Sequence, residues 1–200
     1  MTTIYLIRHA EAEGNLYRIF QGHKDVMLTE RGELQVRALA ERFREIPVDA
    51  VYSSDLSRAW ETCELALGKV PYVKDARLRE IDVGTLVGLT AEECTERYGQ
   101  GHFDAREKLD FSPYGGECRE DLLRRIRSFL KELQRSEYER VAVFTHAGLI
   151  LALLEAIWGF AVSGKKIHRA NCMVAALEYT EGIWRLYGWN MFDAEKQQEI

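Results

Sequence analysis

The sequence predicts an α/β fold: a three-layer α/β/α sandwich with a mostly parallel mixed sheet and a small inserted cap. Five short apolar runs are typical of buried strands, at 3–7, 50–52, 141–144, 174–179 and 184–187. Helical patterns separate the first three runs, and such β–α–β alternation favours a parallel sheet between layers of helices. The last two runs flank Glu181-Gly182 as hairpin strands do, so at least one strand should be antiparallel.

The helices have recognisable starts and stops. Thr29 is expected to begin the first helix, which stops near Pro47. Ser54 or Asp55 is expected to cap the second helix, which ends at Gly68. A long amphipathic helix later in the chain has one apolar face, formed by Leu122, Ile126, Phe129, Leu130 and Leu133.

The stretch from about 86 to 116 differs from its surroundings. Thr90 and Glu93 form a capping box for a short helix, but the pattern from 99 to 116 is irregular and rich in glycine. We therefore expect one domain, 1–200, in which residues 86–116 form a cap inserted over the main body.

Composition narrows the function classes. Hydrophobic residues make up 46% of the 200 residues and charged residues 30%, an ordinary globular balance. A net charge of -5 gives no reason to expect nucleic acid or a membrane as partner. The cysteines form no CxxC pair and have no short spacing to histidine, so neither a zinc site nor a disulfide framework is indicated. We expect a cytoplasmic protein, and the sequence leaves a homodimer open.

Polar and cationic residues follow three of the predicted strands. Arg8-His9 follows the first, 53–58 the second and 145–148 the third, and ligands of α/β sheets bind at the carboxyl ends of strands. His9 and His146 are each followed by small residues, which let a ligand approach the backbone, and His146 precedes a predicted helix whose N-terminus favours an anion. Arginine forks at these strand ends match phosphate oxygens. A phosphate site is therefore predicted.

At these positions the sequence resembles the histidine phosphatase superfamily, also called the phosphoglycerate mutase-like family. LIRHAEAEGN at 6–15 is similar to the family signature, although Ala10 stands where the family usually has glycine. Further segments match in order: GHKDVMLTERG at 22–32, SSDLSRAWET at 53–62, LREIDVG at 78–84, GGEC at 115–118 and FTHAG at 144–148. The family often has an aromatic and an acidic residue where this chain has 85–88, so that edge of the pocket departs from the pattern.

The resemblance implies a role for each of nine positions. His9 would be the nucleophile, passing through a phosphohistidine, and Glu80 the general acid. The transferring phosphoryl group would be bound by Arg8, Arg58 and His146. Further contacts to phosphate and substrate would come from Asn15, the backbone N–H of Ala147, Gln21 and Gly22. No metal or other cofactor is implied.

This mechanism sets conditions on two side chains. His9 should be neutral, with one ring nitrogen donating to a backbone carbonyl so that the other can attack. Glu80 should be protonated before attack, so that it can protonate the leaving oxygen. Asp82 is an alternative acid, and Asn15 could instead serve to shape its own loop.

The expected function is hydrolysis of a small phosphorylated metabolite. The alternatives are a cofactor-dependent phosphoglycerate mutase, which typically has a longer chain, and a non-catalytic phospholigand-binding protein on the same fold. The sequence does not name the substrate among ribazole phosphate, sugar phosphates and phosphoglycerates.

Other chemistry-bearing residues are expected to be structural or solvated. His23, His102 and His168 lack partners at ligand spacing. The basic stretch of Lys165, Lys166, His168 and Arg169 is expected to be a solvated face. Cys118 and Arg124 fit a cysteine-phosphatase spacing, but an acidic, helical segment separates them where that chemistry needs a glycine-rich loop.

Overall fold

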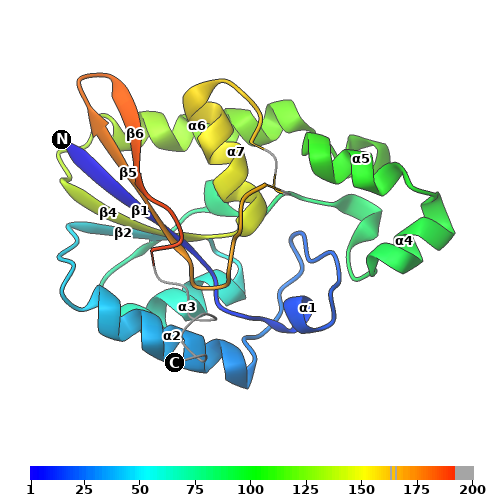
Figure 1. Cartoon of the computed structure of the whole chain (residues 1–200), viewed down its shortest axis with the longest axis horizontal. Helices are drawn as coiled ribbons and strands as arrows, with labels where there is room; N and C mark the ends of the chain where they lie inside the picture. The colour runs from blue at the N-terminus through cyan, green and yellow to red at the C-terminus, as the bar shows by residue number, and fades with distance from the viewer. Residues whose placement is uncertain (163, 165, 192–200) are drawn as a thin grey trace.

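A mixed sheet forms the centre of the computed structural model, which describes residues 1–162, 164 and 166–191. Within these residues the sheet has six strands in the order β3-β2-β4-β1-β5-β6 (Figure 1). The strands are β1 (Thr2–Arg8), β2 (Ala50–Ser53), β3 (Val73–Lys74), β4 (Arg140–Thr145), β5 (Val174–Thr180) and β6 (Ile183–Gly188). β1, β4, β2 and β3 pair in parallel, whereas β5 is antiparallel to both β1 and β6. The predicted mixed sheet with a terminal hairpin is confirmed.

The two faces of the sheet carry separate apolar cores, because alternate strand residues point to opposite sides. Ile4, Leu6, Val141 and Val143 pack with helices α6 (Arg119–Leu133) and α7 (Ala147–Trp158). Ile7, Ala142 and Phe144 pack on the other face with α2 (Glu30–Phe43) and α3 (Ser57–Leu67). The three-layer α/β/α arrangement is therefore as predicted, with α6 and α7 on one side of the sheet and α2 and α3 on the other (Figure 1).

Helix caps agree with the sequence in most places and differ at α3. Thr29 caps α2 by accepting a hydrogen bond from the backbone of Gly32, and Gly68 ends α3 as expected. Neither Ser54 nor Asp55 is the N-cap of α3, so that prediction is wrong: the N-cap is Leu56, which has no capping side chain. The Asp25 carboxylate, distant in sequence, instead accepts from the Ser57 N–H at 2.8 Å.

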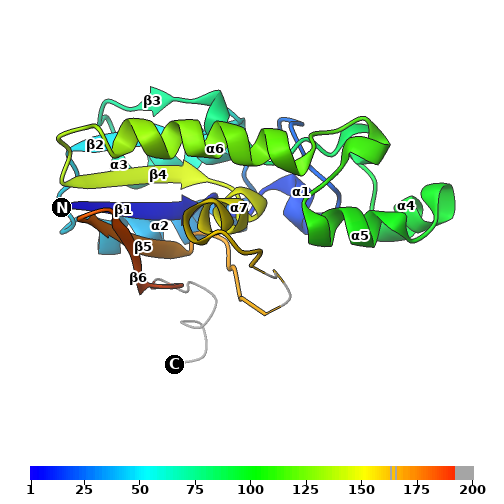
Figure 2. The ribbon, with the colours of Figure 1, turned by 90° about the horizontal axis from the view of Figure 1, so that it is seen from above.

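The segment between α3 and α6 contains little sheet and several short helices: η1 (Ala76–Leu78), η2 (Gly84–Leu86), α4 (Ala91–Tyr98), α5 (Gly101–Lys108) and η3 (Ser112–Tyr114). The Thr90–Glu93 capping box of α4 is confirmed, with both reciprocal hydrogen bonds present. Residues 99–116 were expected to be irregular, but they contain α5, which begins at a glycine and has no side-chain cap. Figure 2 shows α4 and α5 at the end of the molecule beyond the strands; that they act as a cap remains a prediction.

Two further features complete the described fold. The short helix α1 (Glu13–Leu16) follows β1 and carries Asn15. Among the described residues, no helix is both long enough and apolar enough to cross a membrane.

Candidate active site

His9 and His146 lie side by side because β1 and β4 are parallel neighbours that end at the same edge. Arg8 pairs with Thr145 in the register, and the backbone N–H of His9 donates to Thr145 O at 2.9 Å. Each histidine is the residue that follows its strand, and the ring centroids are 5.2 Å apart. Both side chains are buried. Residues 137 positions apart in the sequence thus form one site, as the strand-end rule predicts.

His9 is oriented by a contact with its own backbone surroundings. Its Nδ1 lies 2.7 Å from the carbonyl oxygen of Ala10. A carbonyl only accepts, so Nδ1 carries the proton and Nε2 keeps its lone pair. The Ala10 N–H donates to the Thr62 hydroxyl at 3.0 Å, which ties this turn to α3. Ala10 is buried and does not have a positive φ, so alanine fits the position where the family usually has glycine.

Electrostatics favour neutral imidazoles at both positions. Burial lowers the pKa of His9 well below its usual range, and the neighbouring cations Arg58 and Arg8 lower it further. The pKa of His146 is also lowered, first by burial, then by the positive charge of Arg58, and further by its neighbour His9 and by other arginines. A neutral His9 has on Nε2 the lone pair that a nucleophile needs. Its attack on phosphorus remains a prediction.

The strand end of β2 contributes Ser54 and positions Arg58. Ser54 N–H donates to Phe144 O at 2.9 Å, and its hydroxyl lies 2.9 Å from His146 Nε2. Arg58, in the first turn of α3, is 1% exposed and donates to the carbonyls of Lys24 and Gly22, each at 2.9 Å. Burial lowers the pKa of Arg58 to about 10, while Glu80 and Asp25 oppose that shift. The guanidinium therefore remains charged at neutral pH, and on one side it faces the carbonyl oxygens of Lys24 and Gly22.

Glu80 reaches the same place from a segment outside the sheet. Its carboxylate accepts the N–H groups of Gly148 and Leu149, both at 3.1 Å, at the N-terminus of α7. The positive end of that helix dipole favours an anion at this point. The backbone of Gly148 is close to the carboxylate: a Cβ built on this glycine would lie 3.1 Å from Glu80 Cδ. Asp82, the alternative acid, turns its side chain to the N–H of Gly84 at 3.0 Å and caps its own loop.

The remaining predicted site residues surround this centre. Arg8 donates from a guanidinium nitrogen to Arg169 O and lowers the pKa of both histidines. Asn15 Oδ1 accepts the Ala12 N–H at 3.1 Å, which is the loop-shaping role that the sequence left open. Ala147 begins α7 directly after His146.

Gln21 and Gly22 lie on the loop that Arg58 contacts. The buried Oε1 of Gln21 has no hydrogen-bond partner among the described residues, so its acceptor capacity is unused there. Gly22 has a φ of +49°, which glycine adopts readily, and its carbonyl accepts from Arg58. Both residues therefore lie where a substrate could meet them, although their role in binding remains a prediction.

The structure adds residues that the sequence did not indicate. Asn171 Nδ2 donates to His9 O at 3.0 Å and approaches Asn15 Oδ1 at 3.4 Å. Arg169 turns inward rather than lying on a solvated face, with Nη2 donating to Gly164 O at 3.1 Å. Burial lowers the pKa of Arg169, and the negative charge of Glu80 opposes that shift, so the two side chains interact electrostatically. Lys165, from the same basic stretch, lies outside the described residues.

Two of the residues expected to be structural contact the site or α5. His23 Nε2 donates to the backbone carbonyl of Glu80 at 2.8 Å. His102 is buried in α5, and its ring packs edge-on against Phe20 at 6.0 Å. Cys118 is the N-cap of α6, and Arg124 pairs with Asp121, so they do not form a cysteine-phosphatase loop. No group of three or more metal-ligating side chains occurs in the described part of the chain.

Comparison with known proteins agrees with this geometry. The family model of the histidine phosphatase superfamily (branch 1) matches residues 4–191. A probable phosphoglycerate mutase GpmB of Salmonella paratyphi A is 31% identical over 195 residues, covering 94% of this chain and 90% of that protein. A mycobacterial glucosyl-3-phosphoglycerate phosphatase, solved as a complex with VO3, superposes with a TM-score of 0.86 at 30% identity, covering 95% of this chain and 99% of that one.

A more distant structure shares the fold. The putative alpha-ribazole-5'-P phosphatase of Escherichia coli K-12 has a TM-score of 0.85 at 22% identity, over 94% of this chain and 96% of its own. The family model matches nearly the whole chain, and the two buried histidines at adjoining strand ends lie with Arg8 and Arg58 as that family match leads one to expect. This chain belongs to the histidine phosphatase superfamily.

Proposed function

We propose that the protein is a phosphomonoesterase that hydrolyses a small phosphorylated metabolite through a phosphohistidine at His9. The observation that carries the proposal is the arrangement of His9: it is buried, its Nδ1 is held by Ala10 O at 2.7 Å, and cations surround its ring. Such a residue has a lone pair on Nε2 and an environment that attracts the oxygens of a phosphate dianion.

The first step forms one bond and breaks one. His9 Nε2 attacks phosphorus to form an N–P bond, and the bond from phosphorus to the leaving oxygen breaks. Arg8, Arg58 and His146 hold the phosphoryl oxygens, whose charge they stabilise in the transition state. Glu80 donates its proton to the leaving oxygen, which departs as an alcohol. The N–H groups of Gly148 and Leu149, which hold the Glu80 side chain, stabilise the carboxylate that this proton transfer leaves behind.

The second step returns the enzyme to its starting state. Glu80, now ionised, takes a proton from a water molecule, whose oxygen attacks phosphorus as the N–P bond breaks. Phosphate leaves and His9 is again neutral. The sequence of steps conserves atoms and protons and requires no metal, since the arginines supply the positive charge.

The proposed substrate class is a phosphorylated metabolite, and one solved relative supports it. The mycobacterial structure at 30% identity is named a glucosyl-3-phosphoglycerate phosphatase and was solved in complex with VO3. The alpha-ribazole neighbour lies below the identity at which more than fold can be compared. A panel of sugar phosphates, phosphoglycerates and ribazole phosphate, ranked by kcat/KM, would identify the preferred substrate.

The second candidate is a phosphoglycerate mutase, which is favoured by the name of the Salmonella relative. A mutase holds its phosphoenzyme until the intermediate has reoriented, whereas a phosphatase lets water attack. Phosphate release without a requirement for bisphosphoglycerate would support hydrolysis. Isomerisation of phosphoglycerate that depends on bisphosphoglycerate would support the mutase instead.

The nucleophile is tested by His9→Ala, with His168→Ala as the matched control because His168 is exposed. We expect His9→Ala to abolish turnover while its circular dichroism stays that of the parent. Quenching the parent during turnover should trap an acid-labile, base-stable phosphohistidine that the variant lacks. Turnover that persists in His9→Ala would overturn the proposed reaction. A parent protein that binds phosphorylated ligands but shows no turnover would be a non-catalytic binder.

Metal independence is a separate test. We expect EDTA to leave the rate unchanged, because the charge at phosphorus is supplied by Arg8 and Arg58. Loss of activity with EDTA that is restored by a divalent cation would favour a metallohydrolase.

A further inference from the structure

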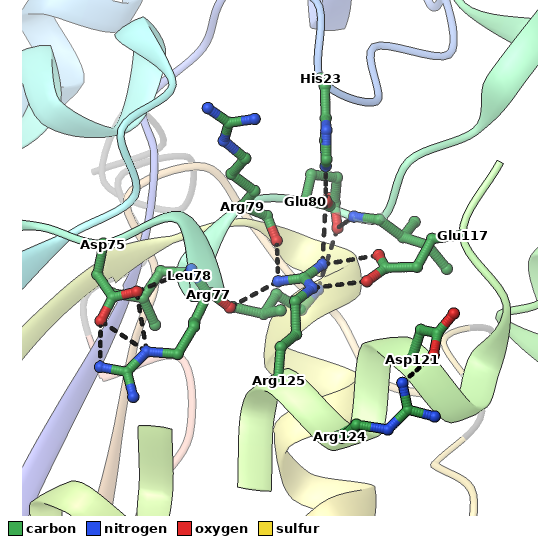
Figure 3. Close-up of polar contacts among 12 residues, drawn as sticks. His23, Asp75, Arg77, Leu78, Arg79, Glu80, Glu117, Asp121, Arg124 and Arg125 are labelled. Carbon is green, nitrogen blue, oxygen red and sulfur yellow. Dashed lines mark hydrogen bonds and ion pairs between the residues drawn. The ribbon is translucent and has the colours of Figure 1, made fainter. Parts of the chain in front are cut away.

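The segment that carries Glu80 is held in place by side chains rather than by a sheet. This segment, residues 77–80, begins in the last two residues of η1 and is outside every strand, yet each of its four consecutive carbonyls accepts a side-chain hydrogen bond. Thr145 Oγ1 donates to Leu78 O at 2.8 Å, from the end of β4. The other three carbonyls, those of Arg77, Arg79 and Glu80, are bound by one arginine, Arg125 of α6 (Figure 3).

The Arg125 guanidinium uses all five of its donors at this point. One terminal nitrogen donates to Arg77 O at 2.6 Å and to Arg79 O at 2.8 Å. The other donates to Glu80 O at 3.2 Å and to Glu117 at 2.9 Å, and Nε donates to the second Glu117 oxygen at 2.7 Å. The side chains of Arg125 and Glu117 are 17% and 14% exposed, so the pair is largely shielded from water.

Glu117 is the acidic residue of the GGEC segment, which the proposed reaction does not use. Its bidentate pair fixes the plane of the guanidinium and therefore the direction of the donors that reach the carbonyls. The Glu117 N–H also donates to Asp82 O at 2.9 Å. A Cβ on Gly116 would overlap Asp82 O, and one on Gly84, whose φ is +56°, would overlap Tyr114 O. The GGEC segment therefore packs backbone to backbone against the segment that follows Glu80.

We propose that Glu117 and Arg125 are positioning residues for the general acid Glu80. The Glu117–Arg125 pair fixes three carbonyls of residues 77–80, so that the Glu80 carboxyl points at the α7 N-terminus beside His146. This inference rests on the proposed function, because it assumes that Glu80 protonates the leaving oxygen. Neither positioning residue touches the reacting atoms; each acts through the backbone that carries Glu80.

The test compares two substrates that differ in their need for an acid. An alkyl phosphate such as glycerol phosphate has a poor leaving group and requires protonation, whereas 4-nitrophenyl phosphate leaves readily as the phenolate. For Arg125→Met we expect kcat for the alkyl phosphate to fall by about 100-fold, since misplacing a catalytic group by about 1 Å costs that much. The kcat for 4-nitrophenyl phosphate should fall far less. Glu117→Gln should shift the same ratio in the same direction but less strongly.

Matched controls lie on the same helix and in its first turn. Arg124→Met removes an exposed arginine that pairs with Asp121 of the same helix (Figure 3), and Glu120→Gln removes an exposed carboxylate. Neither should change the ratio of the two rates. Circular dichroism and thermal unfolding check that each variant is folded, and if Arg125→Met does not fold, Glu117→Gln gives the decision alone.

A double-mutant cycle assigns the effect to Glu80. In a Glu80→Gln background, Arg125→Met should cause no further loss with the alkyl phosphate, because there is no acid left to position. Equal losses for both substrates, or a full additional loss in the Glu80→Gln background, would show that the pair only stabilises the fold. If Glu80→Gln itself spares the alkyl phosphate, then Glu80 is not the acid and the proposed function fails at that step, independently of Arg125.

Discussion

Gly148→Ala tests how closely the α7 N-terminus must approach Glu80. The added methyl would lie 3.1 Å from Glu80 Cδ, 3.4 Å from Oε2 and closer still to Oε1. The carboxylate is the end of a flexible side chain, so it can move away while the helix backbone stays in place. In doing so it loses its hydrogen bonds to the N–H groups of Gly148 and Leu149.

The effects of Gly148→Ala on the free energy of unfolding partly offset each other, whereas its effect on catalysis should be large. Two hydrogen bonds that water partly replaces are worth about 1 kcal/mol each, and replacing glycine by alanine in a helix returns about 1 kcal/mol. We therefore expect the free energy of unfolding to fall by only about 1 kcal/mol. A displaced acid, in contrast, should lower kcat for an alkyl phosphate on the order of 100-fold.

The assay measures kcat and KM for the alkyl phosphate beside denaturant unfolding of the same preparation. In a Glu80→Ala background the group that the methyl meets is gone, so Gly148→Ala should cost no further activity and should raise stability. A Gly148→Ala enzyme that keeps the parent kcat would refute the view that Glu80 acts from this position. A loss of equal size in the Glu80→Ala background would do the same.

Three further predictions follow from buried polar groups. Because burial lowers the pKa of His9 and His146, the unfolded chain binds protons that the folded chain does not as pH falls below about 6.5. Stability should therefore be full above that pH and fall below it, by at most about 1.4 kcal/mol per pH unit for each histidine. Between pH 7.5 and 5.5, the free energy of unfolding measured with denaturant should change less steeply with pH in His146→Gln than in the parent. An equal dependence on pH in the two proteins would contradict the assignment. Ser54→Ala removes the partner of His146 Nε2 and should cost about 1–3 kcal/mol of unfolding free energy; a loss below about 0.5 kcal/mol in chemical denaturation would count against it. Thr90→Ala removes the N-cap side chain of α4 and should lower the free energy of unfolding by about 1 kcal/mol. The kcat for 4-nitrophenyl phosphate should stay unchanged. A denaturation midpoint equal to that of the parent would show that this N-cap is dispensable.

The sheet and the strand-end site could be predicted because their signals are local. An apolar run such as 141–144 is rich in β-branched and aromatic residues and too short for a buried helix, so it predicts an interior strand whose end places His146. The capping box of α4 is likewise contained in four residues. Helix α5 was missed because it starts at a glycine without a cap and buries little apolar surface.

Contacts between distant residues could not be predicted in the same way. Asp25 caps α3 from 32 positions away, and Asn171 donates to the backbone of His9 from 162 positions away. Arg169 looked like part of a solvated basic stretch because its sequence neighbours are polar, whereas its guanidinium turns toward the chain interior. Each of these depends on where another segment lies, which periodicity does not record.

The backbone of Gly84 lies close to that of Tyr114, and the backbone of Gly116 lies close to that of Asp82. These contacts bring together the two ends of the segment that holds α4 and α5. The chain leaves and re-enters the main body at adjoining points, so an insertion in the turn between α4 and α5 would lengthen a loop without pulling on the reacting groups. Such an insertion should leave the fold intact, provided that Gly84 and Gly116, which bring the two ends of this segment together, are retained.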